Sequence, residues 1–467
     1  MKNDVKIDVT NSEKGGGFRK EIGLFGGISL VAGMTIGSGI YYLGSYVLQR
    51  AEMSMGMALL CWIIGGFVSI LGGLCFAELG ASMPVAGGMT VYLSKAYNPS
   101  VGFVNGFSLF FINGSGSIAA LAIAFVTAFH SLVPMSDMTI KIIAIFVIIL
   151  LTALNYKGVR VATLFQNFTM VARVIPLFLI IILGLAMGNE SVSMSIVPTT
   201  GSAGIGKMIT MIAFATFASL WAYEGWTNLN TVAEEMKNPK RDLPLSIIIS
   251  LVFITIVYTL FNYAIYRVIP AGEVGTMIEA NNIYLGSEVA SRLMGNLGYY
   301  VVLIGMAVGI IGTINGDVLT FPRTYYSMAK EGYFPESFGK LHPKYGIPHA
   351  ATMVQAGIAI VLVMMRNLEQ LTGLVVFTSA ALNMLAIGAV LVFRKKYPNL
   401  DRPYKVWGGI PTVIITLILF AILLVNEFIG DPVNSLIGLI VPAIGLVAYQ
   451  YYKKKNDGKD YAGDNIE

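Results

Sequence analysis

Long apolar runs recur from one end of this chain to the other, and charged residues gather in the short stretches between them. A helix needs about 20 consecutive apolar residues to cross the hydrocarbon core of a bilayer, so runs of this length predict membrane-spanning helices. Only 12% of the 467 residues are charged and 55% are apolar, whereas soluble domains carry about 25% charged residues. The sequence therefore predicts an all-α polytopic membrane protein that binds the lipid bilayer and has no sizeable soluble domain.

The apolar runs predict twelve transmembrane helices within a membrane domain over residues 21–452, between polar tails over 1–20 and 453–467. The first run is too long for the core of a cleavable signal peptide, so we expect it to be retained as a helix. The expected helices cover residues 24–48, 56–80, 101–129, 139–154, 161–187, 208–232, 245–268, 299–321, 350–365, 371–393, 410–428 and 433–452.

The lysines and arginines between the runs predict the orientation. When both tails are placed in the cytoplasm, 24 of the 31 basic residues lie on the cytoplasmic side and six lie outside, and Arg173 remains in the middle of the fifth run. Cytoplasmic loops of membrane proteins carry this excess of positive charge, so both termini are expected to be cytoplasmic. The net charge of +5 is then a property of loops, and we expect no nucleic-acid partner because no basic patch is interleaved with aromatic residues.

The first run is interrupted at mid-membrane by glycine and polar residues. Glycine destabilises a helix interior by about 1 kcal/mol relative to alanine. Two interpretations remain open: the small residues allow close helix packing, or they mark an unwound stretch whose free N–H groups and half-helix dipole bind an anion. The interrupting residues are Thr35, Ile36, Gly37, Ser38, Gly39 and Ile40.

The sixth run is interrupted by a carboxylate and a glycine at similar depth. A charged side chain there costs about 2.5 to 3.5 kcal/mol on insertion scales, so Glu224 implies a partner, a cavity or protonation; a structural hydrogen bond inside the bundle is the alternative. Glu224 and Arg173 are the one buried acid and one buried base that we expect. Interruptions five runs apart are typical of an inverted five-helix repeat with a binding site at the midplane. The residues at this interruption are Ser219, Leu220, Trp221, Ala222, Glu224 and Asn228.

Several short motifs follow one another in order along nearly the whole chain. They are Gly37-Ser38-Gly39-Ile40, Ala77-Glu78-Leu79-Gly80 with Pro84 and Gly87-Gly88, Ala222-Tyr223-Glu224-Gly225-Trp226, Glu234-Glu235-Met236-Lys237-Asn238-Pro239, Asn315-Gly316, Pro322-Arg323 and Arg402-Pro403-Tyr404. With these motifs the chain, from Lys20 to about Tyr452, resembles the amino acid–polyamine–organocation (APC) superfamily and, within it, the L-type amino acid transporter (LAT) family, including bacterial serine/threonine exchangers.

The resemblance implies a LeuT-like fold, a five-plus-five inverted repeat with broken helices one and six plus two C-terminal helices. It implies that the backbone of Gly37–Gly39 binds a substrate carboxylate and that carbonyls near Ser219–Ala222 bind the α-amino group. Trp221 is then a candidate gate, with ordinary aromatic packing as the alternative. By position the substrate side chain meets Asn113, Glu224, Asn228 and Asn383, although each of these also suits a hydrogen bond between helices.

Arg173 departs from the family pattern, because relatives commonly carry lysine there in place of a bound sodium ion. Arginine keeps the positive charge but does not readily release a proton, which favours sodium-independent transport and weakens a role for residue 173 as proton carrier. Its guanidinium is expected to pair with Glu224 or with carbonyls of the first helix. A purely structural ion pair is the alternative.

The function we expect is sodium-independent exchange of neutral amino acids of small or medium size, like serine and threonine, by alternating access. Because of Glu224, a cationic or broad-specificity permease stays open, as does a transporter-like amino acid sensor. We expect no enzyme activity, cofactor or metal, since no cluster of catalytic or ligating residues shares one depth and no histidine has metal-ligand spacing. A channel would favour repeated rings along a pore.

The cysteines and the resemblance together predict a protein that works without a covalent accessory subunit. Cys61 and Cys75 lie about four turns apart in the second run and cannot pair with each other. Eukaryotic relatives use a cysteine between helices three and four to link a heavy chain, and residues 131–137 contain none. We therefore expect a multi-pass protein of a bacterial cell membrane with no disulfide-linked heavy chain.

Overall fold

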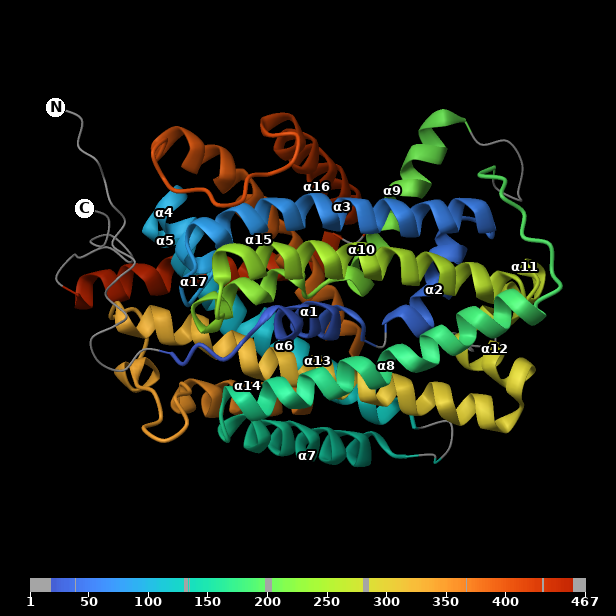
Figure 1. Cartoon of the computed structure of the whole chain (residues 1–467), viewed down its shortest axis with the longest axis horizontal. Coiled ribbons are helices and arrows are strands. Elements are labelled where there is room, and N and C mark those ends of the chain that lie inside the picture. Colours follow the sequence, from blue (N-terminus) through green and yellow to red (C-terminus); the bar gives the residue numbers. More distant parts are fainter. Residues whose placement is uncertain are drawn as a thin grey trace.

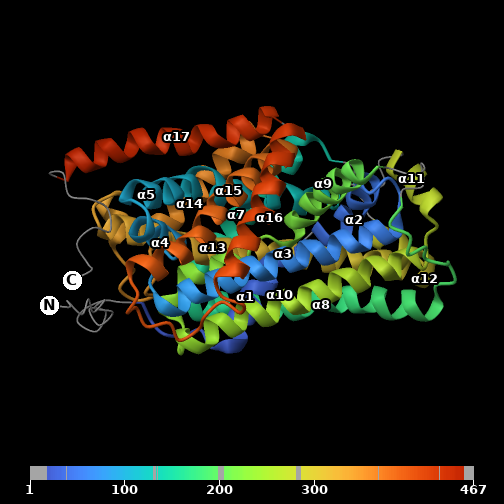
Figure 2. The ribbon, with the colours of Figure 1, turned by 90° about the horizontal axis from the view of Figure 1, so that it is seen from above.

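The computed structural model describes residues 18–37, 39–129, 133, 135–197, 204–279, 285–366, 368–430 and 432–456. Within these ranges the chain is helical apart from loops and one isolated bridge between Ile22 and Met236. Most helices run along the long axis of the molecule, as Figures 1 and 2 show. The expected all-helical architecture is confirmed.

Each of the twelve apolar runs matches one or more helices of the structure. Eight helices of the described part are long and apolar enough to cross a membrane, and α1 and α14 are shorter apolar helices; the count of twelve spans stays a prediction. The helices that match the runs in order are α1 (Leu24–Thr35) with α2 (Gly39–Arg50), α3 (Met55–Ser82), α5 (Pro99–Ser108) with the π-helical turn η2 (Leu109–Asn113) and α6 (Gly114–Thr127), α7 (Asp137–Tyr156), α8 (Val159–Met187), α9 (Ile205–Tyr223) with the 3₁₀ helix η3 (Trp226–Glu235), α10 (Pro239–Tyr266), α13 (Asn296–Lys330), α14 (His349–Met365), α15 (Leu368–Lys396), α16 (Ile410–Gly430) and α17 (Pro432–Lys455).

Four short helices lie in connections where the sequence analysis expects none. They are amphipathic or brief, so they lack the long apolar run by which a membrane helix is recognised. The start of α5 nearby has clear local causes, since the Asn98 side chain accepts a hydrogen bond from the Ser100 N–H and Pro99 occupies the first turn. The four are α4 (Met89–Ala96), α11 (Ala271–Glu279), α12 (Leu285–Met294) and η4 (Glu336–Gly339).

The outer helices expose apolar side chains in a way that suits lipid. Phe146 on α7, Phe168 on α8 and Ile418 on α16 are 62%, 67% and 54% exposed. Exposed large apolar side chains in such number are unusual on a soluble monomer. In a bilayer these faces meet hydrocarbon, whereas α3 and α13 are largely enclosed by other helices.

The interrupted helices occupy the middle of this bundle. α1 packs against α8, α10, α13 and η3, and α2 packs against α9. α10 in turn packs along α3, which Figure 1 shows as parallel ribbons above α1. The two interruptions are therefore surrounded by continuous helices.

The end of the bundle at which the described chain begins, called here the Phe18 end, carries paired buried charges. The Arg323 Nε donates to Glu235 Oε1 at 2.6 Å and its Nη2 to Glu235 Oε2 at 3.3 Å, with both side chains at most 2% exposed. The Glu235 carbonyl accepts the N–H groups of Glu21 and Ile22, both at 3.0 Å. The expectation of a single buried base is therefore wrong, because Arg323 lies inside α13 and not in a loop.

A second pair, of the buried Glu78 with the partly exposed Arg394, ties α3 to α15 at the same end. The Arg394 Nε and Nη2 donate to the two oxygens of Glu78 at 2.9 and 2.6 Å. The N–H of Val406 donates to Glu78 at 2.7 Å. This carboxylate therefore fixes the loop after α15 as well as the helix.

Candidate functional site

The two interruptions meet each other in the centre of the bundle. α1 ends at Thr35, and α9 ends where Glu224 turns to an extended conformation with ψ 151°. Gly225 follows at φ +118°, a left-handed conformation that favours glycine, and a Cβ there would lie 3.0 Å from the Met34 carbonyl carbon. A Cβ on Gly39 would lie 3.3 Å from the Ala222 Cα. The glycines thus allow each break to approach the other, and the expected unwinding is present.

Buried donors bind the carbonyls that the break in α1 leaves free. Arg173 donates to the Gly33 carbonyl and, through Nη1 at 2.7 Å, to that of Ile36. The Tyr258 hydroxyl lies 3.1 Å from the carbonyls of both Thr35 and Ala222. Because a hydroxyl carries one proton, it donates to one of these carbonyls at a time. Tyr258 therefore links the two breaks.

Arg173 is completely buried on α8 and forms no ion pair with a carboxylate in the part of the chain that the structure describes. Its Nε donates to the Thr169 carbonyl at 3.1 Å. Glycine at position 312 is required for this arrangement, since a Cβ there would lie 1.5 Å from Nη2. As expected, the guanidinium of Arg173 bonds to carbonyls of the first helix; the other expected partner, Glu224, does not bond to it in the described chain. The guanidinium sits at the C-terminal end of α1, where the helix dipole favours a cation.

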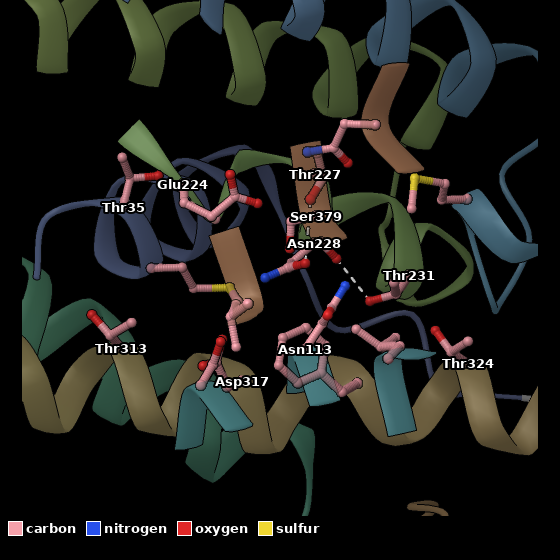
Figure 3. A pocket seen from close by; sticks show the side chains of 18 of the residues that line it. Thr35, Asn113, Glu224, Thr227, Asn228, Thr231, Thr313, Asp317, Thr324 and Ser379 are labelled. Carbon is pink, nitrogen blue, oxygen red and sulfur yellow. Dashed lines mark hydrogen bonds between the residues drawn. The ribbon is translucent and has the colours of Figure 1, made fainter. Parts of the chain in front are cut away.

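A cavity lies against both breaks (Figure 3). It brings together most of the predicted site residues, from α1, α2, η2, α9, η3 and α15. Those lining it are Thr35, Gly37, Gly39, Asn113, Trp221, Ala222, Glu224, Asn228 and Asn383.

Four predicted residues do not line this cavity. Ile40 is buried in the apolar core and the Ile36 carbonyl is bonded to Arg173. The Ser219 hydroxyl donates to the Thr216 carbonyl at 2.7 Å. Leu220 lines a smaller neighbouring cavity that shares Trp221, Glu224 and Asn383 with the first. Ser38 lies outside the described residues.

The π-helical turn η2 places Asn113 on the cavity wall. One turn of π-helix contains an extra residue, so side chains after it are rotated relative to a continuous α-helix. The Asn113 Oδ1 is buried and has no hydrogen-bond partner within the described chain. Asn113 is thus free to bond to a ligand.

A family model described as amino acid permease matches residues 22–448, which include both breaks and the cavity. The chain belongs to the amino acid permease family. The permease is 30% identical over 443 residues to the serine/threonine exchanger SteT of Bacillus subtilis (strain 168), covering 94% of this chain and 98% of that protein. It is 29% identical to the b(0,+)-type amino acid transporter 1 of Mus musculus, covering 96% and 92%. It is 28% identical to the cystine/glutamate transporter of Homo sapiens, covering 93% and 85%.

These matches confirm the resemblance to the APC superfamily and to LAT-type transporters. The permease is a multi-pass membrane protein of amino acid transport, and its family implies small-molecule amino acid substrates.

Sequence reasoning missed polar residues of the permease that complete the cavity wall. The most important is Asp317 on α13, which is 3% exposed; together with the buried Glu78 and Glu235 it makes the expectation of a single buried acid wrong. The signal was available, since the argument that singled out Glu224 applies equally to an acid inside the eighth apolar run. The other missed polar residues are Thr90, Asn105, Ser117, Thr227, Thr231, Thr313, Thr324 and Ser379.

The wall of the permease cavity combines backbone at two helix ends with polar side chains. The N–H groups at the start of α2 are donors for an anion, and the described lining adds amides, hydroxyls and two carboxyl groups. No group of three or more metal-ligating residues occurs in the described part of the chain. The arrangement can hold a small polar molecule that has both a positive and a negative group.

Proposed function

We propose that this permease exchanges amino acids across the cell membrane by alternating access, without sodium. In this proposal twelve spans form a five-plus-five inverted repeat with two further helices, and both termini lie in the cytoplasm of a bacterial cell. The observation that carries it is the meeting of two helix breaks, five apolar runs apart, at one central cavity.

The zwitterionic part of the substrate binds at the two breaks. The carboxylate accepts hydrogen bonds from backbone N–H groups of Gly37–Gly39, and the α-amino group donates hydrogen bonds to carbonyls near the end of α9. The presence of Gly37, Gly39 and Ala222 on the cavity wall supports this placement. Trp221, also on the wall, covers the bound substrate.

Sodium independence is supported by Arg173. A sodium ion would need free carbonyl oxygens, and the guanidinium already bonds to those of Gly33 and Ile36. Arginine supplies a permanent cation at this place. The transport cycle then requires no inorganic cation there.

Neutral amino acids of serine or threonine size are the substrate class we propose first, supported by the similarity to the serine/threonine exchanger of Bacillus subtilis. A cationic or broad-specificity permease is the second candidate, favoured by Glu224 and Asp317 on the cavity wall. A transporter-like sensor would bind the same molecules without moving them.

Exchange is tested with purified permease in proteoliposomes loaded with unlabelled serine, threonine or alanine. We expect labelled serine to enter faster into loaded vesicles than into empty ones, with or without sodium. Binding without stimulation by internal substrate would indicate a sensor, and a strict requirement for sodium would contradict the role of Arg173.

A further inference from the structure

Asp317 is a carboxyl group inside the helix bundle without a counter-charge. It lies on α13, is 3% exposed and lines the central cavity. Within the described chain it accepts no hydrogen bond and forms no ion pair, whereas Glu235 is paired with Arg323 and Glu78 with Arg394. An ionisable side chain at this depth of a membrane marks a substrate or ion pathway.

The cations and the phenol nearest to Asp317 along the helices are bonded to other groups. Arg173, on the neighbouring α8, donates to carbonyls of α1 and to that of Thr169. Arg323, on α13 itself, is paired with Glu235 of η3. The Tyr325 hydroxyl donates to the Leu109 carbonyl at 3.2 Å. None of these groups neutralises Asp317.

The other elements that pack against α13 bring no cation to the cavity. Helices α1, α5, η2 and α6 contain no charged residue. The carboxylate of Glu234 on η3 accepts the Ala86 N–H at 3.2 Å. The charged or histidine residues of α7, α12, η4 and α14 do not line the cavity; they are Asp137, Lys141, Glu288, Arg292, Glu336 and His349.

The charged group that faces Asp317 across the cavity is a second carboxyl group. Figure 3 shows Glu224, from the end of α9, on the wall opposite Asp317. Two carboxylates in one water-poor cavity repel each other, and burial disfavours their charged forms. Pairs of this kind are relieved when they hold a proton.

Alternating access changes the exposure of this carboxyl group to water. While the cavity is open, water hydrates the carboxylate and stabilises its charge. When the cavity closes on a neutral amino acid, that water is lost and the neutral acid is favoured. A protonated carboxyl group also has an O–H to donate, and the Asn113 Oδ1 on the neighbouring η2 is a buried acceptor without a partner in the described chain. Closing therefore favours the binding of a proton.

We propose that Asp317 is a proton-binding site that is filled each time the cavity closes on a substrate, so that a proton travels with the amino acid. This proposal rests on the proposed function, since closing and opening are its alternating access. The carboxylate binds a proton from the water on the side to which the cavity is open and releases it to the water on the other side. No bond of the substrate changes. Arg173 does not readily release a proton, so the proton site lies on α13 and not on α8.

The pH dependence of exchange tests the site. Labelled serine is exchanged for unlabelled serine in proteoliposomes with equal pH on both sides. Because the protonated form is the one that closes, exchange is fast at low pH and slows as the pH rises. We expect the natural protein to exchange at least about fivefold faster at about pH 5.5 than at about pH 8. In Asp317→Asn, which is neutral at every pH, this ratio falls toward one.

Two further variants separate Asp317 from other groups that titrate. Glu224→Gln removes the facing negative charge, so Asp317 holds its proton less firmly and the loss of rate moves to lower pH. Histidine titrates in the same pH range, and His342 lies in a loop outside the cavity lining. His342→Gln is therefore the matched control, and its ratio of rates stays as in the natural protein.

Calorimetry of serine binding in detergent gives a second readout that needs no transport. In two buffers with different heats of ionisation it counts the protons taken up with the ligand. We expect the natural protein to take up as much as about one proton per serine near pH 8, and Asp317→Asn to take up none. This readout decides the matter if Asp317→Asn no longer exchanges serine.

A natural protein that exchanges equally fast at both pH values would overturn the proton site, as would a pH dependence or a proton uptake that Asp317→Asn retains. If serine binds but no amino acid exchanges, the proposed function fails by itself, and proton uptake on binding still tests Asp317.

Discussion

The Phe18 end and the central cavity differ in whether their buried charged side chains form ion pairs within the described chain. At the Phe18 end Arg323 and Glu235 neutralise each other, and Arg394 neutralises Glu78. In the centre Arg173 is bonded to carbonyls, and Asp317 lines the cavity without an ion pair among the described residues. Arg323, Glu235, Arg173 and Asp317 are all at most 3% exposed, so burial alone does not explain the difference.

The difference indicates a division of roles. Groups that neutralise each other need nothing from outside and hold helices together, as Arg323 holds α13 to η3. Groups without a counter-charge gain most when a ligand or a moving helix end supplies one. The comparison predicts that changes in the centre reduce transport and that changes at the Phe18 end reduce stability.

The largest expected effect is at Arg173. Arg173→Ala leaves the Ile36 carbonyl without this donor, leaves the Gly33 carbonyl with the Thr313 hydroxyl alone, and removes the central cation. We therefore expect it to lose most exchange activity, at least about tenfold, since each unsatisfied buried group costs about 1–3 kcal/mol. Arg173→Lys keeps the charge and retains transport. Initial rates of uptake into proteoliposomes measure the activity of both variants. Unchanged uptake by Arg173→Ala would contradict a role of Arg173 in transport.

Breaking the buried pair at the Phe18 end comes next. Arg323→Ala leaves Glu235 buried without its partner, for which the expected loss of stability is about 3–5 kcal/mol. The measurement is heat unfolding in detergent. Replacing both partners by Met and Leu should recover much of the stability, and a single variant as stable as the natural protein would contradict the role of this pair.

Gly312→Ala tests whether the position of Arg173, and not only its charge, matters. The added Cβ would lie 1.5 Å from Nη2, so the guanidinium must leave the carbonyls of α1. We expect a several-fold slower exchange at unchanged charge, less than for Arg173→Ala. Gly357→Ala, where nothing lies within 4 Å, is the control and should exchange normally; equal rates for the two variants would count against the argument.

The smallest effect is expected where a pair is exposed to water. Lys240 and Asp401 are 2.7 Å apart, but their side chains are 61% and 70% exposed. Lys240→Ala should change stability by less than about 1 kcal/mol, measured as the Tm in detergent at low and high salt. A loss as large as that of Arg323→Ala would mean that burial does not separate the two classes of pair.

The helices and their breaks could be predicted because both depend on local sequence. Apolar runs mark the helices, and glycines and Glu224 interrupt them visibly. Arg323 was expected in a loop because the apolar run ends at residue 321. The helix α13 is 35 residues long, about 50 Å at 1.5 Å per residue, and it extends beyond the end of that run. Asp317 was missed although the same rule applied to it. Which groups pair could not be predicted, because Arg323 and Glu235 are 88 residues apart.

The π-helical turn at Leu109–Asn113 has a consequence for how such a cavity can change. Removing one residue from it would restore a continuous α-helix and turn everything on one side by about 100°. A neighbouring residue would then take the place of Asn113 on the cavity wall, although no residue of the chain had been substituted. Selectivity in this wall therefore depends on the length of the chain as well as on its residues, and a family member could acquire a new substrate by losing a single amino acid.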